Sequence, residues 1–391
     1  CGVRCSFAAG RETLHGDRRR ERLCDFGAFG VSSGRPEIRE LRVRAVRVPM
    51  LEPHRTASGT ITESPLVLTD VITDEGILGH SIVFTYTAAA LQPTADLIRN
   101  LEPLVKGEPL APKEIEGKLA RRFRLLGTQG LVGMAMAAID MALWDALARS
   151  SGMSLAGLLG GAEKPLRAYG AVGYYGVSGS AKVAEDWARR GFRGVKAKIG
   201  YPDVKEDLEV IRAIRAAVGK DVAIMVDYNQ SLSPVEAVQR LRVLEGEQLT
   251  WVEEPTLAHD YEGQALVARE IATPIQSGEN WWGVQDMRHA VAAHASDYVM
   301  LDAMRIGGVT GWLRAAALAE THGLPVSSHL WPEISAQLFC VTPTAHWLEY
   351  ADWWNPILAE PLRIEQGLAV PGGAAGTGVE WNEAAVSRCL A

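Results

Sequence analysis

The second half of the chain repeats one unit, a short apolar stretch followed by an amphipathic one, from "GGAEKPLRAYG" to about residue 350. Short apolar stretches bounded by turns predict buried strands, and the amphipathic stretches between them predict helices. A strand–helix unit that recurs every roughly 20 to 30 residues is typical of a closed (β/α) barrel. An open doubly wound sheet is the alternative, but no glycine-rich phosphate loop follows the first strand. The predicted strands are "RAYGAVG", "GVKAKIG", "VAIMVDYNQ", "TWVEEP", "TPIQSGEN", "YVMLDAM", "LPVSSHL" and "HWLEY".

Residues 37–160 follow a different order, with strands first and helices second. "SPLVLTDVITDEGILGHSIVF" predicts two strands joined by a turn around Asp74, Glu75 and Gly76. "GLVGMAMAAIDMALWDALARSSG" predicts a helix that is apolar on most of its surface and is therefore buried. We predict an α+β domain over residues 37–160 and a barrel domain over residues 161–359, with about residues 360–391 packing back on the first domain.

The first 36 residues and the bulk composition limit the class of protein. Residues 1–36 are rich in arginine and have little apolar periodicity, so we predict a disordered extension. A formal net charge of −7 argues against a nucleic-acid or membrane-surface partner. We identify no apolar run of membrane-spanning length and no secretion signal. The five cysteines lack the spacing of a metal site or a disulfide framework, which favours a cytoplasmic location.

The last seven predicted strands each end with a titratable side chain. In a closed barrel the carboxyl ends of the strands face one mouth, so these residues converge although they are distant in sequence. A single charged residue at a strand end is explained by solvation, whereas seven in succession favour a site. In chain order these residues are the pair Lys196 and Lys198, then Asp227, Glu253, Glu279, Asp302, His329 and Glu349.

Asp227, Glu253 and Glu279 end three adjacent predicted strands. Three carboxylates gathered in one mouth repel each other unless a cation compensates them, and an all-oxygen set suits Mg²⁺. Any one of them alone is better explained by a salt bridge at the barrel rim, but the trio favours a metal. Glu254 points to the other face of its strand and is predicted to be structural. Asn229 either contacts a ligand or orients Asp227.

Lys196 and Lys198 lie two residues apart and therefore point to the same side of their strand. Two ammonium groups about 7 Å apart repel by roughly 2.4 kcal/mol at an effective dielectric constant near 20. Such repulsion, with a nearby dication, lowers the pKa of a lysine toward the range that a general base needs. Lys198 is the candidate base, and Lys196 is the residue that tunes it and pairs with an anionic substrate.

Asp302 and His329 end adjacent strands, so the carboxylate can orient the imidazole and raise its basicity. A lone histidine at a strand end is usually structural, but this one has an acid placed beside it. Glu349, if burial keeps it protonated, could donate a hydrogen bond to an oxygen on which charge develops. The alternative for Glu349 is a buried carboxyl group satisfied by backbone donors.

These stretches resemble the enolase superfamily and, within it, the mandelate racemase subgroup. The resemblance runs from about residue 38 to the end of the chain. It is carried by the motifs "VKAKIGYP", "MVDYNQSL", "WVEEPTLAHDYEG", "GENWWG", "DAMRIGGVTGW", "SSHLWPEISA" and "TPTAHWLE". It implies an α/β fold in which an N-terminal α+β domain caps a modified (β/α)7β TIM-like barrel.

The resemblance also implies a chemistry. The carboxylate trio would hold Mg²⁺, with Lys198 as the base on one face of the substrate and Lys196 beside it. The His329–Asp302 dyad would act on the opposite face, and Glu349 would be the acid that stabilises the enolate. Members of this superfamily typically form homo-oligomers, often octamers.

The sequence departs from mandelate racemase where a substrate is selected. Ala171 stands where that subgroup has a serine that contacts the substrate carboxylate. The loop "LEPHRTASGTI" and nearby aromatic residues could bind a polar or doubly charged substrate. The alternative is that the loop is a solvent-facing lid and that the aromatic residues pack beneath it. The residues concerned are His54, Arg55, Phe84, Tyr86 and Tyr174.

We therefore predict a Mg²⁺-dependent enzyme that racemises a 2-hydroxy acid by two-base proton transfer and binds a small anionic carboxylate. An acid-sugar dehydratase is the first alternative, because the same two bases serve when the substrate carries a β-hydroxyl. A barrel that has lost catalysis and acts as a binding or scaffold protein is the second. Clustered buried charges destabilise the fold unless they serve a function, which argues against a site that has lost its activity.

Overall fold

The computed structural model describes residues 34–56 and 59–391. The predicted disordered extension, residues 1–36, lies almost wholly outside the described residues. The first described elements form a three-stranded antiparallel sheet in the order β1-β2-β3. Strands β2 and β3 are joined by a tight turn in which Gly76 has a φ of +82°, a left-handed conformation that glycine adopts without strain. The strands are β1 (Ile38–Thr56), β2 (Gly59–Thr73) and β3 (Leu78–Phe84).

Four helices follow this sheet, and one of them forms much of its core. Helix α3 is long and apolar enough to cross a membrane by length and composition, so the expectation that no such run exists was wrong. Most of it is buried inside the described structure, as its all-round apolar surface predicted. It is therefore a core helix that covers β3. The helices are α1 (Ala88–Val105), α2 (Pro112–Arg122), α3 (Gly130–Ser150) and α4 (Leu155–Leu158).

The remaining strands build the barrel. Parallel strands run in the order β10-β9-β8-β7-β6-β5-β4, and β11 pairs with the other edge of β4. The Ser328 backbone N–H donates to the Trp347 carbonyl over 3.0 Å and links β10 to the segment that enters β11, which closes the ring. The eight strands are β4 (Leu166–Val172), β5 (Gly194–Lys198), β6 (Ala223–Asp227), β7 (Val252–Glu253), β8 (Ile275–Ser277), β9 (Tyr298–Asp302), β10 (Val326–His329) and β11 (Leu348–Tyr350).

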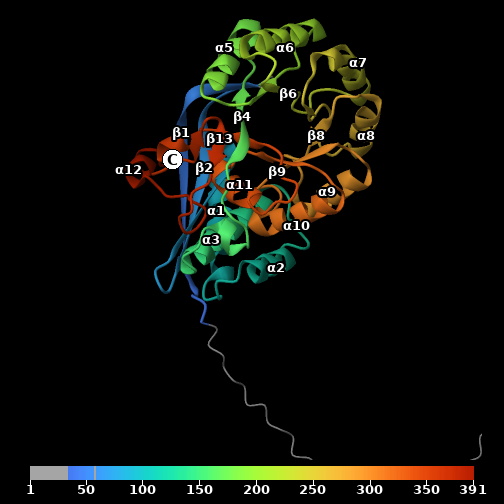
Figure 1. The fold of residues 1–391 in the computed structure, drawn as a ribbon. Coiled ribbons are helices and arrows are strands. Elements are labelled where there is room, and N and C mark those ends of the chain that lie inside the picture. The colour runs from blue at the N-terminus through green and yellow to red at the C-terminus, as the bar shows by residue number, and fades with distance from the viewer. Residues whose placement is uncertain (1–33, 57–58) are drawn as a thin grey trace, which may run out of the picture. The chain divides into compact units, whose positions relative to one another are not determined.

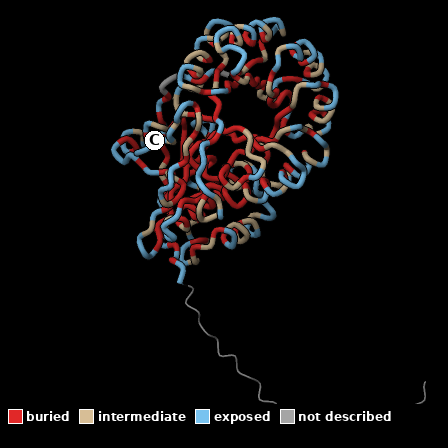
Figure 2. Tube along the Cα trace, in the orientation of Figure 1, coloured by how far each residue is buried: buried red, intermediate tan, exposed pale blue. Residues whose placement is uncertain are grey.

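Seven α-helices alternate with the strands, and α5 to α9 lie outside them in Figure 1. Buried residues follow the strands, and exposed residues lie on the outer turns of the helices (Figure 2). Strand β11 is followed by a short 3-10 helix instead of an α-helix, so the predicted (β/α)7β barrel with its N-terminal α+β domain is confirmed. The helices are α5 (Gly176–Arg189), α6 (Val204–Val218), α7 (Pro234–Leu244), α8 (Tyr261–Glu270), α9 (Gly283–Ala292), α10 (Gly308–Thr321) and α11 (Pro332–Phe339).

The C-terminal segment contacts both the barrel and the three-stranded sheet. Its hairpin pairs antiparallel with β4 through β13. Further on, the Trp381 indole N–H donates to Asp70 Oδ1 over 2.7 Å, and the Ala391 backbone N–H donates to the Ala45 carbonyl over 3.0 Å. The elements of the segment are a 3-10 helix (Asn355–Ile357), β12 (Arg363–Glu365), β13 (Leu368–Val370) and α12 (Glu383–Arg388).

Asp140 joins α3 to the barrel helix α10. Its carboxylate accepts hydrogen bonds from the backbone N–H and the hydroxyl of Thr310, over 3.0 Å and 2.5 Å. Thr310 lies in the first turn of α10, whose N–H groups have no partner within the helix. Burial raises the pKa of Asp140 to about 7, because a buried carboxylate loses its hydration.

Replacing Asp140 with alanine is expected to lower the free energy of unfolding by about 2 kcal/mol, because a buried N–H and a hydroxyl lose their acceptor. Urea denaturation of the native and variant proteins measures this change. Asp96→Ala is the matched control, since the Asp96 side chain is 62% exposed and forms a surface ion pair with Arg99. The control should change the free energy by less than about 0.5 kcal/mol. Equal effects of the two substitutions would contradict the assigned role of Asp140.

Candidate active site

The barrel register brings the predicted strand-end residues together. Lys198 on β5 pairs in register with Asp227 on β6, which pairs with Glu253 on β7. On the other side of the barrel, His329 pairs with Asp302. Side chains of in-register residues on parallel neighbours point to the same side of the sheet, so all of these enter the barrel mouth.

Glu279 reaches the mouth by another route. Strand β8 ends at Ser277, so Glu279 is not a strand-end residue as predicted but lies in the loop beyond it. The turn needs Gly278, whose φ is +137° and whose missing Cβ would lie 2.4 Å from the Met300 carbonyl oxygen. A glycine is required here because any side chain would collide with the backbone of β9.

The three carboxylates of Asp227, Glu253 and Glu279 are buried, and one oxygen from each lies within 4.8 Å of the others. Asn229 orients the first of them by donating its backbone N–H and its side-chain amide to Asp227 over 2.7 Å and 3.0 Å. Glu279 Oε2 is buried and accepts no hydrogen bond from any residue that the structure describes. An unsatisfied buried oxygen beside two more carboxylates fits a hard divalent cation, so the trio could hold a metal ion.

The lysine pair lies among these acids. Lys196 forms ion pairs with Glu253 and with Glu349, the latter over 2.8 Å, and Lys198 forms one with Asp227. Burial alone would lower the pKa of both lysines, but the neighbouring carboxylates outweigh it and raise both values. The predicted lowering was therefore wrong for the structure described here. The sequence places the two ammonium groups side by side, but it does not show that each has a carboxylate closer still.

His329 and Asp302 form the predicted pair. His329 Nδ1 lies 2.7 Å from one oxygen of Asp302, and the other oxygen accepts the Arg305 backbone N–H over 2.8 Å. The free Nε2 of His329 lies 3.5 Å from Glu279 Oε2, at the edge of the trio. Burial lowers the pKa of His329, but the Glu279 charge and the Asp302 hydrogen bond outweigh it and raise the pKa.

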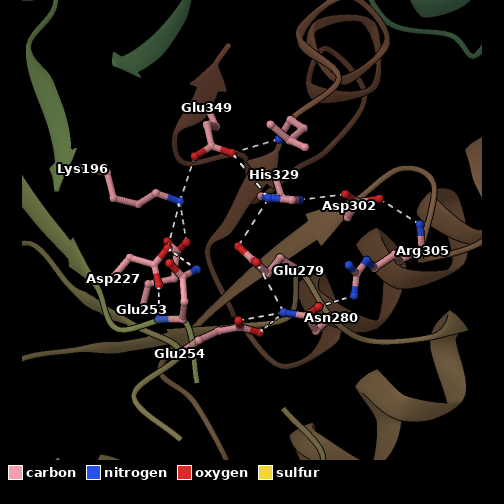
Figure 3. Close-up of polar contacts among 12 residues, drawn as sticks. Lys196, Asp227, Glu253, Glu254, Glu279, Asn280, Asp302, Arg305, His329 and Glu349 are labelled. Atoms are coloured by element: carbon pink, nitrogen blue, oxygen red, sulfur yellow. Dashed lines mark hydrogen bonds and ion pairs between the residues drawn. The ribbon is translucent and has the colours of Figure 1, made fainter. Parts of the chain in front are cut away.

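Glu349 lies between Lys196 and His329, 2.8 Å from Lys196 Nζ and 3.9 Å from His329 Nε2 (Figure 3). It also accepts the Leu330 backbone N–H over 3.0 Å, and Leu330 adopts a left-handed φ of +50°. Burial alone would raise the pKa of Glu349, but Lys196 and His329 hold it at about 2. The expected neutral carboxyl group is therefore wrong for this structure, because two cations stabilise the ionised form.

Three further polar residues, which the sequence analysis did not assign to the site, connect the metal trio to the dyad. The Asn280 amide donates to both oxygens of Glu254, over 2.8 Å and 2.7 Å, and to Glu279 over 3.3 Å. The Arg305 guanidinium donates to the side-chain oxygen Oδ1 of Asn280, and Figure 3 shows this series of contacts from Glu254 to Arg305. Their signal was adjacency, since Asn280 follows Glu279 and Arg305 lies three residues after Asp302.

The predicted substrate-contact residues fall into two groups. His54 is buried, lies 4.8 Å from the Trp353 ring, and has its pKa lowered to about 3 by burial and by Lys198. It is therefore a neutral imidazole next to the charged mouth. The Arg305 guanidinium carbon lies 4.8 Å from the centroid of the Tyr86 ring, and Tyr86 also packs on Phe84.

Arg55 and Tyr174 form the second group and are joined through their backbones. Arg55 is exposed, and its carbonyl accepts the Tyr174 backbone N–H over 2.8 Å. The Tyr174 ring stacks on Tyr201 with 3.9 Å between ring centroids instead of contacting the cluster. Ala171 lies in register with Lys196 and therefore faces the mouth. Trp353, whose ring packs at a tilt against His54, was not predicted, because it lies in a loop after β11 without any periodic signal.

Comparison with known protein families places the chain. A family model described as "Enolase C-terminal domain-like" matches residues 180–385. A second, described as "Mandelate racemase / muconate lactonizing enzyme, N-terminal domain", matches residues 38–160. The first match covers the barrel from within α5 onward, and the second covers the three-stranded sheet with its helices.

Individual relatives agree with these matches. A solved structure of an enolase from Bradyrhizobium, complexed with magnesium and mandelic acid, is 43% identical with a TM-score of 0.88, covering 91% of this chain and 99% of that one. The L-talarate/galactarate dehydratase of Salmonella typhimurium is 30% identical over 78% of each chain. The L-Ala-D/L-Glu epimerase of Clostridium acetobutylicum is 27% identical over 73% of this chain and 80% of its own. The chain therefore belongs to the enolase superfamily, in its mandelate racemase and muconate lactonizing enzyme group.

Proposed function

We propose that the protein is a Mg²⁺-dependent enzyme that removes the proton α to the carboxylate of a 2-hydroxy acid and returns it to either face. The observation that carries the proposal is the position of two bases around one carboxylate trio. Lys198 comes from β5 and His329 from β10, which lie five strands apart in the sheet order. A carbon held above the trio would have an amine on one side and an imidazole on the other.

Asp227, Glu253 and Glu279 would hold the ion. The buried, unsatisfied Glu279 Oε2 supports this assignment, as does the magnesium in the related Bradyrhizobium structure. Bound Mg²⁺ would supply positive charge that stabilises the enolate oxygens of the substrate. Asn229 and Asn280 would fix the orientation of Asp227 and Glu279 through their amide donors.

Each charged residue has a distinct role in the proposal. Lys198 Nζ takes or returns the proton on one face, and His329 Nε2 does so on the other, with Asp302 holding Nδ1. Lys196 donates an N–H to the substrate carboxylate from its place beside Lys198. Glu349, paired with Lys196, lies where a hydrogen bond can reach an enolate oxygen once a proton passes to it.

A hydro-lyase is the second candidate, and the dehydratase relative supports it. If the substrate carries a β-hydroxyl group, His329 can deliver its proton to the leaving oxygen instead of to carbon. The C–O bond then breaks as the enolate collapses, which releases water and an enol; the enol loses its hydroxyl proton and gains a proton at the β-carbon to become the 2-keto acid. The same side chains serve both outcomes, so the substrate decides between them.

Incubation of the protein with Mg²⁺ and a series of 2-hydroxy acids in D₂O tests the proposal. Proton NMR should show loss of the α-hydrogen signal without a 2-keto product, and chiral chromatography should show appearance of the opposite configuration. A stoichiometric 2-keto acid would replace the racemase assignment with the dehydratase. Absence of exchange with every acid would reject both and leave the binding-barrel alternative. We also propose that the protein is a cytoplasmic homo-oligomer, which the family resemblance supports. Sedimentation of the purified protein tests the oligomeric state.

A further inference from the structure

Asp207 is a buried carboxylate to which the proposed reaction assigns no role. It lies in the first turn of α6, the helix that connects β5 to β6. A charged group in the interior destabilises the fold unless it is hydrogen-bonded and paired. The two oxygens of Asp207 have different hydrogen-bond partners, and these partners lie next to the two strand ends that carry Lys198 and Asp227.

One oxygen of Asp207 holds the segment that follows the candidate base. Oδ1 accepts the backbone N–H of Gly200 over 2.8 Å and the backbone N–H of Tyr201 over 2.9 Å. Lys198 is the last residue of β5, so the first of these N–H groups lies two residues beyond it. Hydrogen bonds from backbone N–H groups to a carboxylate are stronger than those between neutral groups, because the acceptor is charged. Asp207 therefore fixes the turn by which the chain leaves β5.

The other oxygen of Asp207 holds the end of β6. Oδ2 accepts the Tyr228 hydroxyl over 3.0 Å, and Tyr228 directly follows Asp227 in the sequence. Oδ2 also accepts an N–H of the Arg240 guanidinium over 3.2 Å, and the same guanidinium nitrogen donates to the Tyr201 carbonyl over 2.8 Å. Arg240 lies on α7, the helix that follows β6. The pair of Asp207 and Arg240 therefore joins the loops after β5 and β6.

The support that Asp207 gives is confined to one side of the barrel mouth. Lys198 and Asp227 are in register on neighbouring strands, and their side chains form an ion pair. The dyad of His329 and Asp302 lies on β10 and β9. None of the hydrogen bonds of Asp207 that the structure describes reaches this dyad. Loss of Asp207 is therefore expected to disturb the β5–β6 side and to leave the β9–β10 side in place.

We propose that Asp207 is a positioning residue that holds Lys198 at the reacting carbon and Asp227 at the metal trio. For Lys198, this inference rests on the proposed function. A base must lie within hydrogen-bond reach of the proton that it removes, and a displacement of about 1 Å can lower a rate by roughly 100-fold. Without Asp207 the turn after β5 loses its acceptor, so Lys198 loses its fixed position. His329 keeps its own support from Asp302.

Exchange of the α-proton from each pure enantiomer, followed by NMR in D₂O at saturating Mg²⁺, tests the proposal. In Asp207→Ala, the enantiomer that depends on Lys198 should exchange at least about tenfold more slowly, and the one that depends on His329 less than about twofold more slowly. The loss should appear in kcat. Asp207→Asn keeps an oxygen that can accept the Gly200 and Tyr201 N–H groups, so it should restore most of the lost rate. Equal losses for both enantiomers would overturn the proposal, because a purely structural role predicts them.

Asp140→Ala controls for a general loss of stability. Asp140 is also a buried carboxylate, and it binds the first turn of another barrel helix. This substitution should lower the free energy of unfolding but leave the ratio of the two exchange rates unchanged. A ratio that changed as much in Asp140→Ala as in Asp207→Ala would show that the effect does not depend on the contacts of Asp207.

Mg²⁺ affinity decides the proposal if the native protein exchanges no acid, a result that rejects the proposed reaction alone. Groups that orient a metal ligand contribute roughly 10- to 100-fold to metal affinity, so titration calorimetry should show about tenfold weaker Mg²⁺ binding in Asp207→Ala. Tyr228→Phe removes only the hydroxyl that joins β6 to Asp207 and should weaken binding about threefold. This milder variant decides the question if Asp207→Ala does not fold. Native affinity in the folded variants would contradict the assigned role.

Discussion

Replacing Lys198 with alanine is expected to stop exchange of the α-proton from one enantiomer of the substrate and to leave exchange from the other. Positioned proton transfer contributes roughly 10²- to 10⁴-fold to a rate, so we expect a loss of about 10³-fold on the affected face. His329→Asn should give the reciprocal result. NMR in D₂O with each pure enantiomer measures both rates.

The reciprocal pattern separates chemistry from damage to the fold. A variant that has lost its structure would lose exchange with both enantiomers. A variant that lacks one base would lose exchange with only one enantiomer. Lys205→Ala removes a lysine that lies outside the site and should change neither rate. If Lys198→Ala and His329→Asn affected the same enantiomer, the two-base assignment would be wrong.

Replacing Glu279 with glutamine is expected to remove most of the affinity for Mg²⁺. The substitution replaces one of the three carboxylates with a neutral amide, and hard divalent ions favour charged oxygen ligands. Titration calorimetry should show a loss of at least about 100-fold in affinity. We expect Mg²⁺ to raise the unfolding temperature of the native protein, because an ion that binds only the folded state stabilises it, and we expect this rise to be lost in the variant.

Glu349→Gln is the matched control for this experiment. Glu349 is a buried carboxylate in the same mouth, but it is not among the three residues whose oxygens lie within 4.8 Å of one another. The variant should bind Mg²⁺ with affinity close to that of the native protein while losing exchange on both faces. If Glu349→Gln abolished metal binding as completely as Glu279→Gln, the metal centre would have to be redrawn around a different set of carboxylates.

The eight barrel strands could be predicted because each is a short apolar run between turn signals. Strand β5 was predicted over residues 194–200 and is observed as Gly194–Lys198. Strand β8 was predicted through Glu279 but ends at Ser277, since the positive φ of Gly278 breaks the pairing. A local sequence pattern does not reveal this break, because it depends on the close approach of the β9 backbone.

The protonation states of the site could not be predicted. The sequence shows that Lys196 and Lys198 are neighbours, and it suggests mutual repulsion that lowers their pKa values. The pKa values are raised instead. The attraction of Lys196 to Glu253 and of Lys198 to Asp227 outweighs the repulsion between the two amines. Charges interact through distance and local burial, and both depend on strands that are remote in sequence.

The sequence by itself determined which residues can take part in the chemistry, because a period of one strand and one helix assigns each titratable residue to the same end of the barrel. It also determined the family, through motifs from "VKAKIGYP" to "TPTAHWLE". Only the tertiary structure decided which of these side chains touch. It alone showed Asn280 and Arg305 linking the trio to the dyad. Contacts between remote segments follow from how the barrel closes, and no local pattern encodes that closure.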